Sequence, residues 1–429
     1  MNGNLIIKNA SELVTCSGFA AKKGQEMSQL HIIPDGAVVV QEGVIKAVGT
    51  TQEIEIALAK SGFDLAEFDT VDARNKAVLP GFVDSHTHFI FGGYRAEEFS
   101  WRLRGDSYMD IMQRGGGIVN TVQATRAASA NELLQAGIKR LDSMLAFGVT
   151  TVEGKSGYGL DKNTEIKQLE VINHLDGIHY IDIVPTFLGA HAVPEDYKGR
   201  QDEFLDYLIE AVMPEVIERK LAEYCDVFCE QNVFSVSQSK RLLTKAREMG
   251  FKIKLHADEI VQLGGAELAA ELNATSADHL LQASDEGIRK MARADVVATL
   301  LPATAFSLKE PYARGRFIID SGCAAALATD FNPGSCFSES IPLIFALATL
   351  YMDITTEEAV SALTINSAAA LDRAETIGSI DVAKQGDLVV LEYPSYKFIP
   401  YHVGVNTVEK VIKKGNLVFD KEKGGMTYC

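Results

Sequence analysis

Short apolar runs recur through the middle of the chain, and most are followed by a longer stretch with a helical pattern. Eight such runs predict strands, at residues 81–86, 150–153, 181–188, 226–230, 252–256, 276–279, 296–300 and 324–328. Eight strands that alternate with helices predict an α/β protein with a (β/α)8 TIM barrel. A doubly wound open sheet is the alternative, but no Gly-x-Gly-x-x-Gly motif follows an early strand.

Helix signals separate the predicted strands. A capping-box pattern at 129–132 predicts a helix that runs to residue 147, where a glycine follows as its stop. Helical patterns also mark residues 260–272, 284–292 and 355–371.

The two ends of the chain resemble each other and differ from the middle. Runs rich in β-branched residues predict strands at 4–9, 36–41 and 43–48, and again at 386–391, 408–413 and 416–419. Because chain ends often lie close together, we expect residues 1–75 and 375–429 to form one composite β-sandwich domain and residues 76–374 to form the barrel. Two unrelated small sheets are the alternative.

Composition narrows the class of protein. The 429 residues are 47% hydrophobic and 23% charged, which is typical of a globular chain with a large core. A net charge of −17 disfavours binding to nucleic acid or to an anionic membrane, so an anionic substrate needs local positive charge at its site. The six cysteines lack the spacing of a disulfide framework or a zinc ribbon, and Cys225 and Cys229 fit small core residues. Without a signal-peptide pattern or a membrane-spanning apolar run, we expect a cytoplasmic protein.

The first predicted barrel strand ends in His86-Thr87-His88. Side chains two apart on a strand point the same way, so both imidazoles can face one point. Polar residues also follow later predicted strands, namely His191, His256, His279 and Asp330. A single histidine of this kind is more often a hydrogen-bonded structural residue. Because a TIM barrel gathers its strand ends in one ring, however, five histidines at such positions favour a shared site.

Three imidazoles and one carboxylate form a donor set that suits zinc and also iron(II) or manganese. The expected ligands are His86, His88, His256 and Asp330. Asp330 can alternatively act mainly as the base that takes a proton from water, or do both. Glu259 and His279 are acid/base candidates because they flank the expected ligands. A helix N-terminal acid and a buried hydrogen-bonded imidazole are their plainer interpretations.

The chain resembles the amidohydrolase superfamily. The pattern spans the whole chain, with Pro-Gly-Phe-Val-Asp-Ser-His-Thr-His at 80–88, the later His256, His279 and Asp330, and strands at both ends. Within the superfamily it is similar to the imidazolonepropionases, in motifs at 91–95, 153–159, 187–191, 256–259 and 329–335.

This resemblance implies hydrolysis of the cyclic amide of 4-imidazolone-5-propanoate to N-formimidoyl-L-glutamate, in histidine degradation. It implies one divalent metal, zinc or iron, a small anionic heterocyclic substrate, and a homodimer. The family's substrate contacts correspond to Arg95, Tyr158, His191, Glu259, Asn332, Gly334 and Ser335. Arg95 with Tyr158 would grip the propionate, since guanidinium makes paired hydrogen bonds with carboxylates, whereas an arginine chosen blind would be a solvated loop charge.

Other functions compete with this interpretation. A mononuclear-metal deaminase of a nucleobase-like heterocycle is the nearest alternative, but a neutral base needs no Arg95 clamp. Many superfamily relatives hold two metals bridged by a carboxylated lysine after strand four, where this chain has Cys229-Glu230. One metal is therefore favoured, with Glu230 as an alternative bridge, and hydantoinase- or dihydroorotase-like ring opening is disfavoured. A metal-free binding protein would be expected to lose ligands, and all four are present.

Overall fold

The predicted TIM barrel is confirmed in the computed structural model, which describes residues 2–61, 65–106, 114 and 116–426. Eight strands pair in chain order, each parallel to its neighbour. They are β6 (Phe82–Asp84), β7 (Val149–Lys155), β8 (Asp182–Ala190), β9 (Tyr224–Cys229), β10 (Lys252–Ala257), β11 (Ser276–His279), β12 (Val297–Leu300) and β13 (Ala325–Leu327). Each coincides with a predicted strand, give or take a few residues.

The barrel closes through the residues that follow its first and last strands. Thr87 and Phe331 form a parallel bridge. On either side of it, the Asp330 amide donates to the His86 carbonyl at 3.0 Å, and the His88 amide donates to the Phe331 carbonyl at 2.9 Å. The seam between β6 and β13 is therefore made by the backbone of three expected metal ligands.

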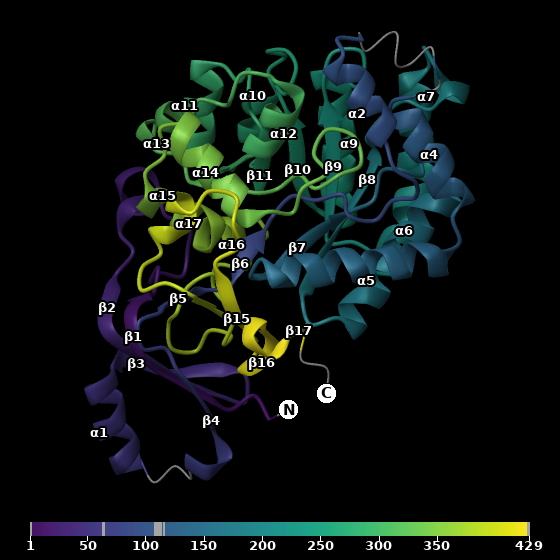
Figure 1. The fold of residues 1–429 in the computed structure, drawn as a ribbon. Helices are drawn as coiled ribbons and strands as arrows, with labels where there is room; N and C mark the ends of the chain where they lie inside the picture. Colours follow the sequence, from purple (N-terminus) through teal and green to yellow (C-terminus); the bar gives the residue numbers. More distant parts are fainter. Residues whose placement is uncertain (1, 62–64, 107–113, 115, 427–429) are drawn as a thin grey trace.

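Helices connect the barrel strands and cover its outside (Figure 1). They include α2 (Ala96–Leu103), α4 (Ile118–Ala127), α5 (Ala130–Ala146), α6 (Lys162–Ile178), α7 (Gln201–Tyr207), α8 (Met213–Glu218), α9 (Val236–Met249), α10 (Gly265–Glu271), α11 (Asp285–Arg293), α12 (Pro302–Leu308), α13 (Gly315–Asp320), α14 (Ile341–Tyr351), α15 (Thr356–Leu363) and α16 (Ile365–Ala369). The predicted capping box before α5 is confirmed, since the Ser129 hydroxyl accepts the Glu132 amide.

Two predicted helices differ from the structure. Residues 260–264 are not helical, and α10 begins only at Gly265, because the buried Asp258 carboxylate accepts the amides of residues 263–266 and folds them into a turn. The predicted helix over 355–371 is interrupted at Thr364 between α15 and α16. The Thr364 hydroxyl donates to the Val360 carbonyl, and such bonds to the preceding turn bend helices.

Both chain ends build a second, mixed sheet, seen in Figure 1 as purple and yellow strands together beneath the barrel. Its strands are β1 (Leu5–Val14), β2 (Ile32–Gln41), β3 (Val44–Thr50), β4 (Asp69–Asp72), β5 (Ala77–Pro80), β14 (Leu388–Leu391), β15 (Val408–Lys413), β16 (Asn416–Asp420) and β17 (Gly425–Met426). The ends join where β5 pairs with β14. Leu13, Leu388 and Ile412 share one buried cluster, so the sheet wraps around a small core as the expected sandwich. β5 extends this sheet past the boundary expected at residue 75.

A partly buried ionic junction links the terminal sheet to the barrel. The Lys413 ammonium of β15 lies 2.7 Å from Asp387 and 2.8 Å from Asp182, which begins β8. Lys414 and Gln385 also bind the Asp182 carboxylate. Asp182 is thus held by three groups from the C-terminal part of the chain.

The described part of the chain contains no helix that is both long and apolar enough to span a membrane. Five cysteines lie within it, all buried and none in a disulfide, and Cys225 and Cys229 are core residues as expected. Cys429 lies outside the described residues.

Candidate metal centre and substrate site

The expected metal ligands meet at the carboxyl end of the barrel strands. The ring centroids of His86 and His256 are 4.6 Å apart, and His88 lies 5.3 Å from the former and 5.5 Å from the latter. Asp330 follows β13, and its Oδ1 lies 3.6 Å from Nε2 of both His86 and His88. Four side chains that are far apart in the sequence therefore face one small volume.

The nitrogen atoms of this cluster fit a bound cation. His86 Nε2 and His256 Nε2 are buried and have no hydrogen-bond partner among the described residues. A buried polar atom without a partner costs roughly 1–3 kcal/mol, so such atoms are expected where a ligand completes the site. Burial also lowers the pKa of His86 and His88 well below the usual value, which keeps both imidazoles neutral and able to bind a metal.

His279 and Glu259 lie beside the expected ligands. The His279 ring at the end of β11 is 5.2 Å from the His256 ring, and its Nδ1 is 3.7 Å from Glu259 Oε1. Burial, reinforced by the charge of Asp330, raises the pKa of Glu259 to about 8, and burial lowers that of His279. Burial also raises the pKa of Asp330 to about 6. A cation bound by Asp330 would favour the ionised form of that carboxyl group. The site thus places a carboxyl group that can donate a proton, Glu259, beside a neutral imidazole that can accept one, His279.

Carboxylates hold the outer nitrogen atoms of two expected ligands. Asp278 Oδ2 lies 2.6 Å from His86 Nδ1, and Asp226 Oδ2 lies 2.9 Å from His256 Nδ1. Carboxylates in this position fix the ring orientation of ligand histidines and leave Nε2 for the metal. The sequence analysis did not place either residue in the site. The one feature that could have pointed to them is an aspartate inside an otherwise apolar strand.

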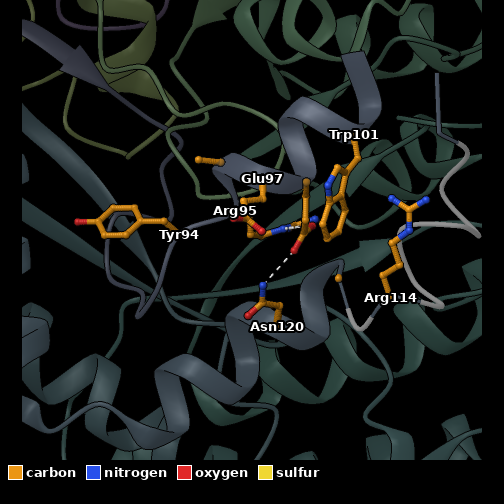
Figure 2. Close-up of a pocket in the computed structure, with 9 residues that line it drawn as sticks. Tyr94, Arg95, Glu97, Trp101, Arg114 and Asn120 are labelled. Atoms are coloured by element: carbon orange, nitrogen blue, oxygen red, sulfur yellow. Dashed lines mark hydrogen bonds and ion pairs between the residues drawn. The ribbon is translucent and has the colours of Figure 1, made fainter. Parts of the chain in front are cut away.

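Arg95 lies at the start of α2, between the loop after β13 and a pocket of about 310 Å³. Its guanidinium packs so closely on Gly334 that a Cβ added there would lie 2.1 Å from Nη1. Its Nε donates to Glu98 at 2.8 Å. Figure 2 shows Arg95 and Asn120 pointing into this pocket, with Trp101 and Arg114 on its wall. The pocket lies outside the histidine cluster, and Arg95 lines it.

Glu98 and Arg102 are further residues here that sequence reasoning missed. The Glu98 carboxylate also accepts the Gly117 amide and the Asn120 side chain, the second bond being a dashed line in Figure 2. Arg102 Nη1 lies 3.5 Å from the Gly334 carbonyl, while its Nε and Nη2 are buried without a described partner. In the sequence, Glu98 and Arg102 look like ordinary solvent-exposed charges on a helix, so nothing marked them as part of a site.

Tyr158 and His191 line the opposite side of the cluster. The His191 ring stacks on His88 with centroids 5.0 Å apart, and the buried Tyr158 ring is 5.3 Å from His191. His191 Nδ1 lies 3.0 Å from the Gly157 carbonyl. Burial lowers the pKa of His191 to about 3, so this imidazole is neutral.

The remaining predicted residues form the loop after β13. The Asn332 side chain donates to the Asp330 carbonyl at 2.7 Å and accepts the amides of Gly334 and Ser335. Asn332 therefore shapes the loop that carries Asp330. Glu230, the alternative metal bridge, accepts the amides of Gln231 and Ile260 instead.

Two comparisons with known proteins, a family model and full-length relatives, give the same family. The model of the Amidohydrolase family matches residues 77–418. The imidazolonepropionase of Clostridium tetani is 65% identical over 98% of this chain and 99% of its own length. That of Bacteroides thetaiotaomicron is 60% identical over 97% and 99%.

Solved structures share the fold at low sequence identity. An adenosine deaminase from Xanthomonas campestris with bound zinc has a TM-score of 0.68 at 18% identity and covers 96% of this chain and 92% of its own. A triazine hydrolase variant reaches a TM-score of 0.74 at 14% identity, over 98% and 95%.

Proposed function

Since the chain belongs to the amidohydrolase family, and within it to the imidazolonepropionases, we propose that it hydrolyses the cyclic amide bond of 4-imidazolone-5-propanoate. The product is N-formimidoyl-L-glutamate, in histidine degradation. The observation that supports this best is the guanidinium of Arg95, which packs on Gly334 in the loop that carries Asp330, in a barrel that also gathers three imidazoles. A substrate that carries a propionate on its ring needs a positive charge for the propionate and a metal-binding cluster for the ring amide.

We propose that His86, His88, His256 and Asp330 hold one divalent metal, zinc or iron. When bound, such a metal supplies a Lewis acid that polarises the ring carbonyl and lowers the pKa of water. The unpaired Nε2 atoms of His86 and His256 support this ligand set, and the absence of thiolates among the four is compatible with either metal.

The chain's own residues would then bind the substrate and move its protons. Arg95 binds the propionate through its free nitrogens, and Tyr158 and His191 hold the ring. As the water oxygen bonds to the carbonyl carbon, Asp330 or His279 accepts the water proton. As the carbon–nitrogen bond breaks, Glu259 donates a proton to the departing ring nitrogen, consistent with the raised pKa of its carboxyl group.

We also propose a homodimer that works in the cytoplasm. Buried cysteines without disulfides suit a reducing compartment. Exposed apolar side chains gather on the neighbouring helices α12, α14 and α17 (Phe398–Tyr401), at Phe306, Leu350, Tyr351 and Tyr401, and such patches are common at subunit interfaces. Native mass spectrometry tests this, and a monomer at micromolar concentration would exclude it.

The test of the reaction is incubation with imidazolone propionate while its ultraviolet absorbance is followed. We expect loss of absorbance, formation of N-formimidoyl-L-glutamate, and inhibition by a chelator that added zinc or iron reverses. Release of ammonia from a neutral nucleobase, with no turnover of imidazolone propionate, would favour the deaminase instead.

A further inference from the structure

Five charged side chains are completely buried inside the barrel, next to the proposed metal ligands. They are Glu153 and Lys155 of β7, Asp226 of β9, Lys254 of β10 and Asp278 of β11, each 0% exposed. Removing charges from water is costly unless close partners compensate. Three carboxylates and two ammonium groups in one cluster provide such partners, and their arrangement around the ligands indicates what the cluster does.

The Lys155 ammonium lies between the two carboxylates that face ligand histidines. Its Nζ is 2.7 Å from Asp226 Oδ2 and 3.7 Å from Asp278 Oδ2. These are the same oxygen atoms that lie 2.9 Å from His256 Nδ1 and 2.6 Å from His86 Nδ1. One cation therefore contacts both oxygens that orient the two imidazoles.

The other buried lysine has different contacts. Lys254 Nζ donates to the Ser85 carbonyl and to Glu153, each at 2.9 Å, and lies 3.8 Å from Asp278. Glu153 is shared, since it is also 3.0 Å from Lys155. If Lys155 were neutral, Lys254 would remain beside Glu153 and Asp278, and Asp226 would lose the ammonium group that contacts it. Repulsion among the three buried carboxylates would then push Asp226 and Asp278 away from their present positions.

We propose that Lys155 is a positioning residue for the metal centre. Its ammonium fixes Asp226 and Asp278, which in turn aim His256 Nε2 and His86 Nε2 at one point. The proposal rests on the metal-dependent function proposed above and adds that two ligands from different strands are oriented by one shared cation.

The test compares Lys155→Met with Lys384→Met. Lys384 is another completely buried lysine, but it donates to the carbonyls of Gly18, Ala374 and Ile377 near the terminal sheet. Each purified full-length variant is titrated with Zn²⁺ against a competing chelator. We expect Lys155→Met to bind Zn²⁺ about 10- to 100-fold more weakly, the usual effect of losing a partner of a metal ligand, and Lys384→Met to bind it as the wild type does.

Spectroscopy separates orientation from general loss of stability. With Co²⁺ in place of Zn²⁺, Lys155→Met should shift the visible absorption bands, and Lys155→Arg, which keeps the charge, should restore part of the affinity. Wild-type Zn²⁺ affinity in Lys155→Met, or an equal loss in Lys384→Met, would overturn the proposal. Metal affinity is measured without substrate, so a wild type that binds Zn²⁺ but leaves imidazolone propionate intact would refute only the proposed reaction.

A charge-balanced variant covers the case in which Lys155→Met does not fold. Lys155→Gln with Glu153→Gln removes one buried charge of each sign, and Glu153→Gln alone is its control. The double variant should bind Zn²⁺ at least about tenfold more weakly than the control. Equal affinity in the two would contradict a role for the Lys155 ammonium.

Discussion

Among the described residues, Glu98 is the one whose side chain hydrogen-bonds to the Arg95 guanidinium. Glu98 binds Nε, so the two Nη groups remain for a ligand carboxylate, which a guanidinium binds in pairs. Arg95→Ala should therefore weaken substrate binding by about 2–5 kcal/mol, the usual range for a desolvated charge pair, and raise KM accordingly. Steady-state kinetics would show this. Arg104→Ala, an exposed arginine next to the same helix, is the control, and an unchanged KM for Arg95→Ala would exclude the clamp.

Glu98→Gln tests the support of that clamp. The amide keeps the size of the side chain but loses the charge that orients Arg95, so we expect KM to rise by on the order of five- to tenfold while kcat changes less. In a double variant with Arg95→Ala the two effects should not add, because Glu98 acts through Arg95. Additive effects would place Glu98 outside the clamp.

His256 lies among the other histidines of the cluster, since its ring contacts those of His86, His88 and His279. His256→Ala should lose bound metal and turnover together, as measured by metal analysis and the absorbance assay on one sample. The exposed His402→Ala serves as control. An active His256→Ala enzyme with a full complement of metal would remove His256 from the ligand set.

At the level of elements, one carboxylate organises the loop between β10 and α10. Asp258 accepts four consecutive amides at the start of α10, and it lies two residues after the proposed ligand His256 and one residue before the proposed acid Glu259. Asp258→Ala should lower the free energy of unfolding by about 2 kcal/mol, at the upper end for a lost helix cap, and also reduce kcat. Asp258→Asn, which keeps one acceptor oxygen, should lose less. Denaturant unfolding measures both, and equal stability of all three proteins would contradict this role.

This loop also shows which features of the fold the sequence could not predict. The barrel strands could be predicted because short apolar runs between turn residues report burial directly, and the ligands followed from the strand ends. Residues 260–264 were wrongly predicted to be helical because apolar spacing is a local signal. It does not report the bonds that side-chain carboxylates accept from this backbone, one of them accepted by Glu230, which lies 30 residues before Ile260. The sequence analysis did not predict Lys155 and Asp226 as site residues for a related reason. A charge inside a strand is usually a solvated residue, and only the folded barrel brings the two within 2.7 Å.

For the molecule as a whole, the junction at Asp182 predicts a pH dependence. Burial opposes ionisation of this carboxyl group, but Lys413 and its other partners outweigh burial and lower its pKa to about 2, from an ordinary value near 3.8. Folding thus favours the charged form. The resulting stability is present above pH 4 and is lost as the pH falls towards 2.

Asp182→Asn should therefore lower the stability at pH 7 by about 1–2 kcal/mol, since the side chain is 35% exposed and water screens part of the interaction. The difference from wild type should shrink below pH 4. Thermal unfolding midpoints across this range measure it. A constant difference from pH 7 to pH 2.5 would assign the loss to packing instead of charge.

The seam that closes the barrel sets the order in which the site can be assembled. Its two edges, at 86–88 and 330–331, are separated by more than half of the chain, and both carry proposed ligands. A nascent chain on the ribosome can expose His86, His88 and His256 long before residue 330 has been added, yet it has no last edge to hold them in place. The proposed ligand set is therefore complete only after the chain beyond residue 330 has been synthesised and the seam has closed.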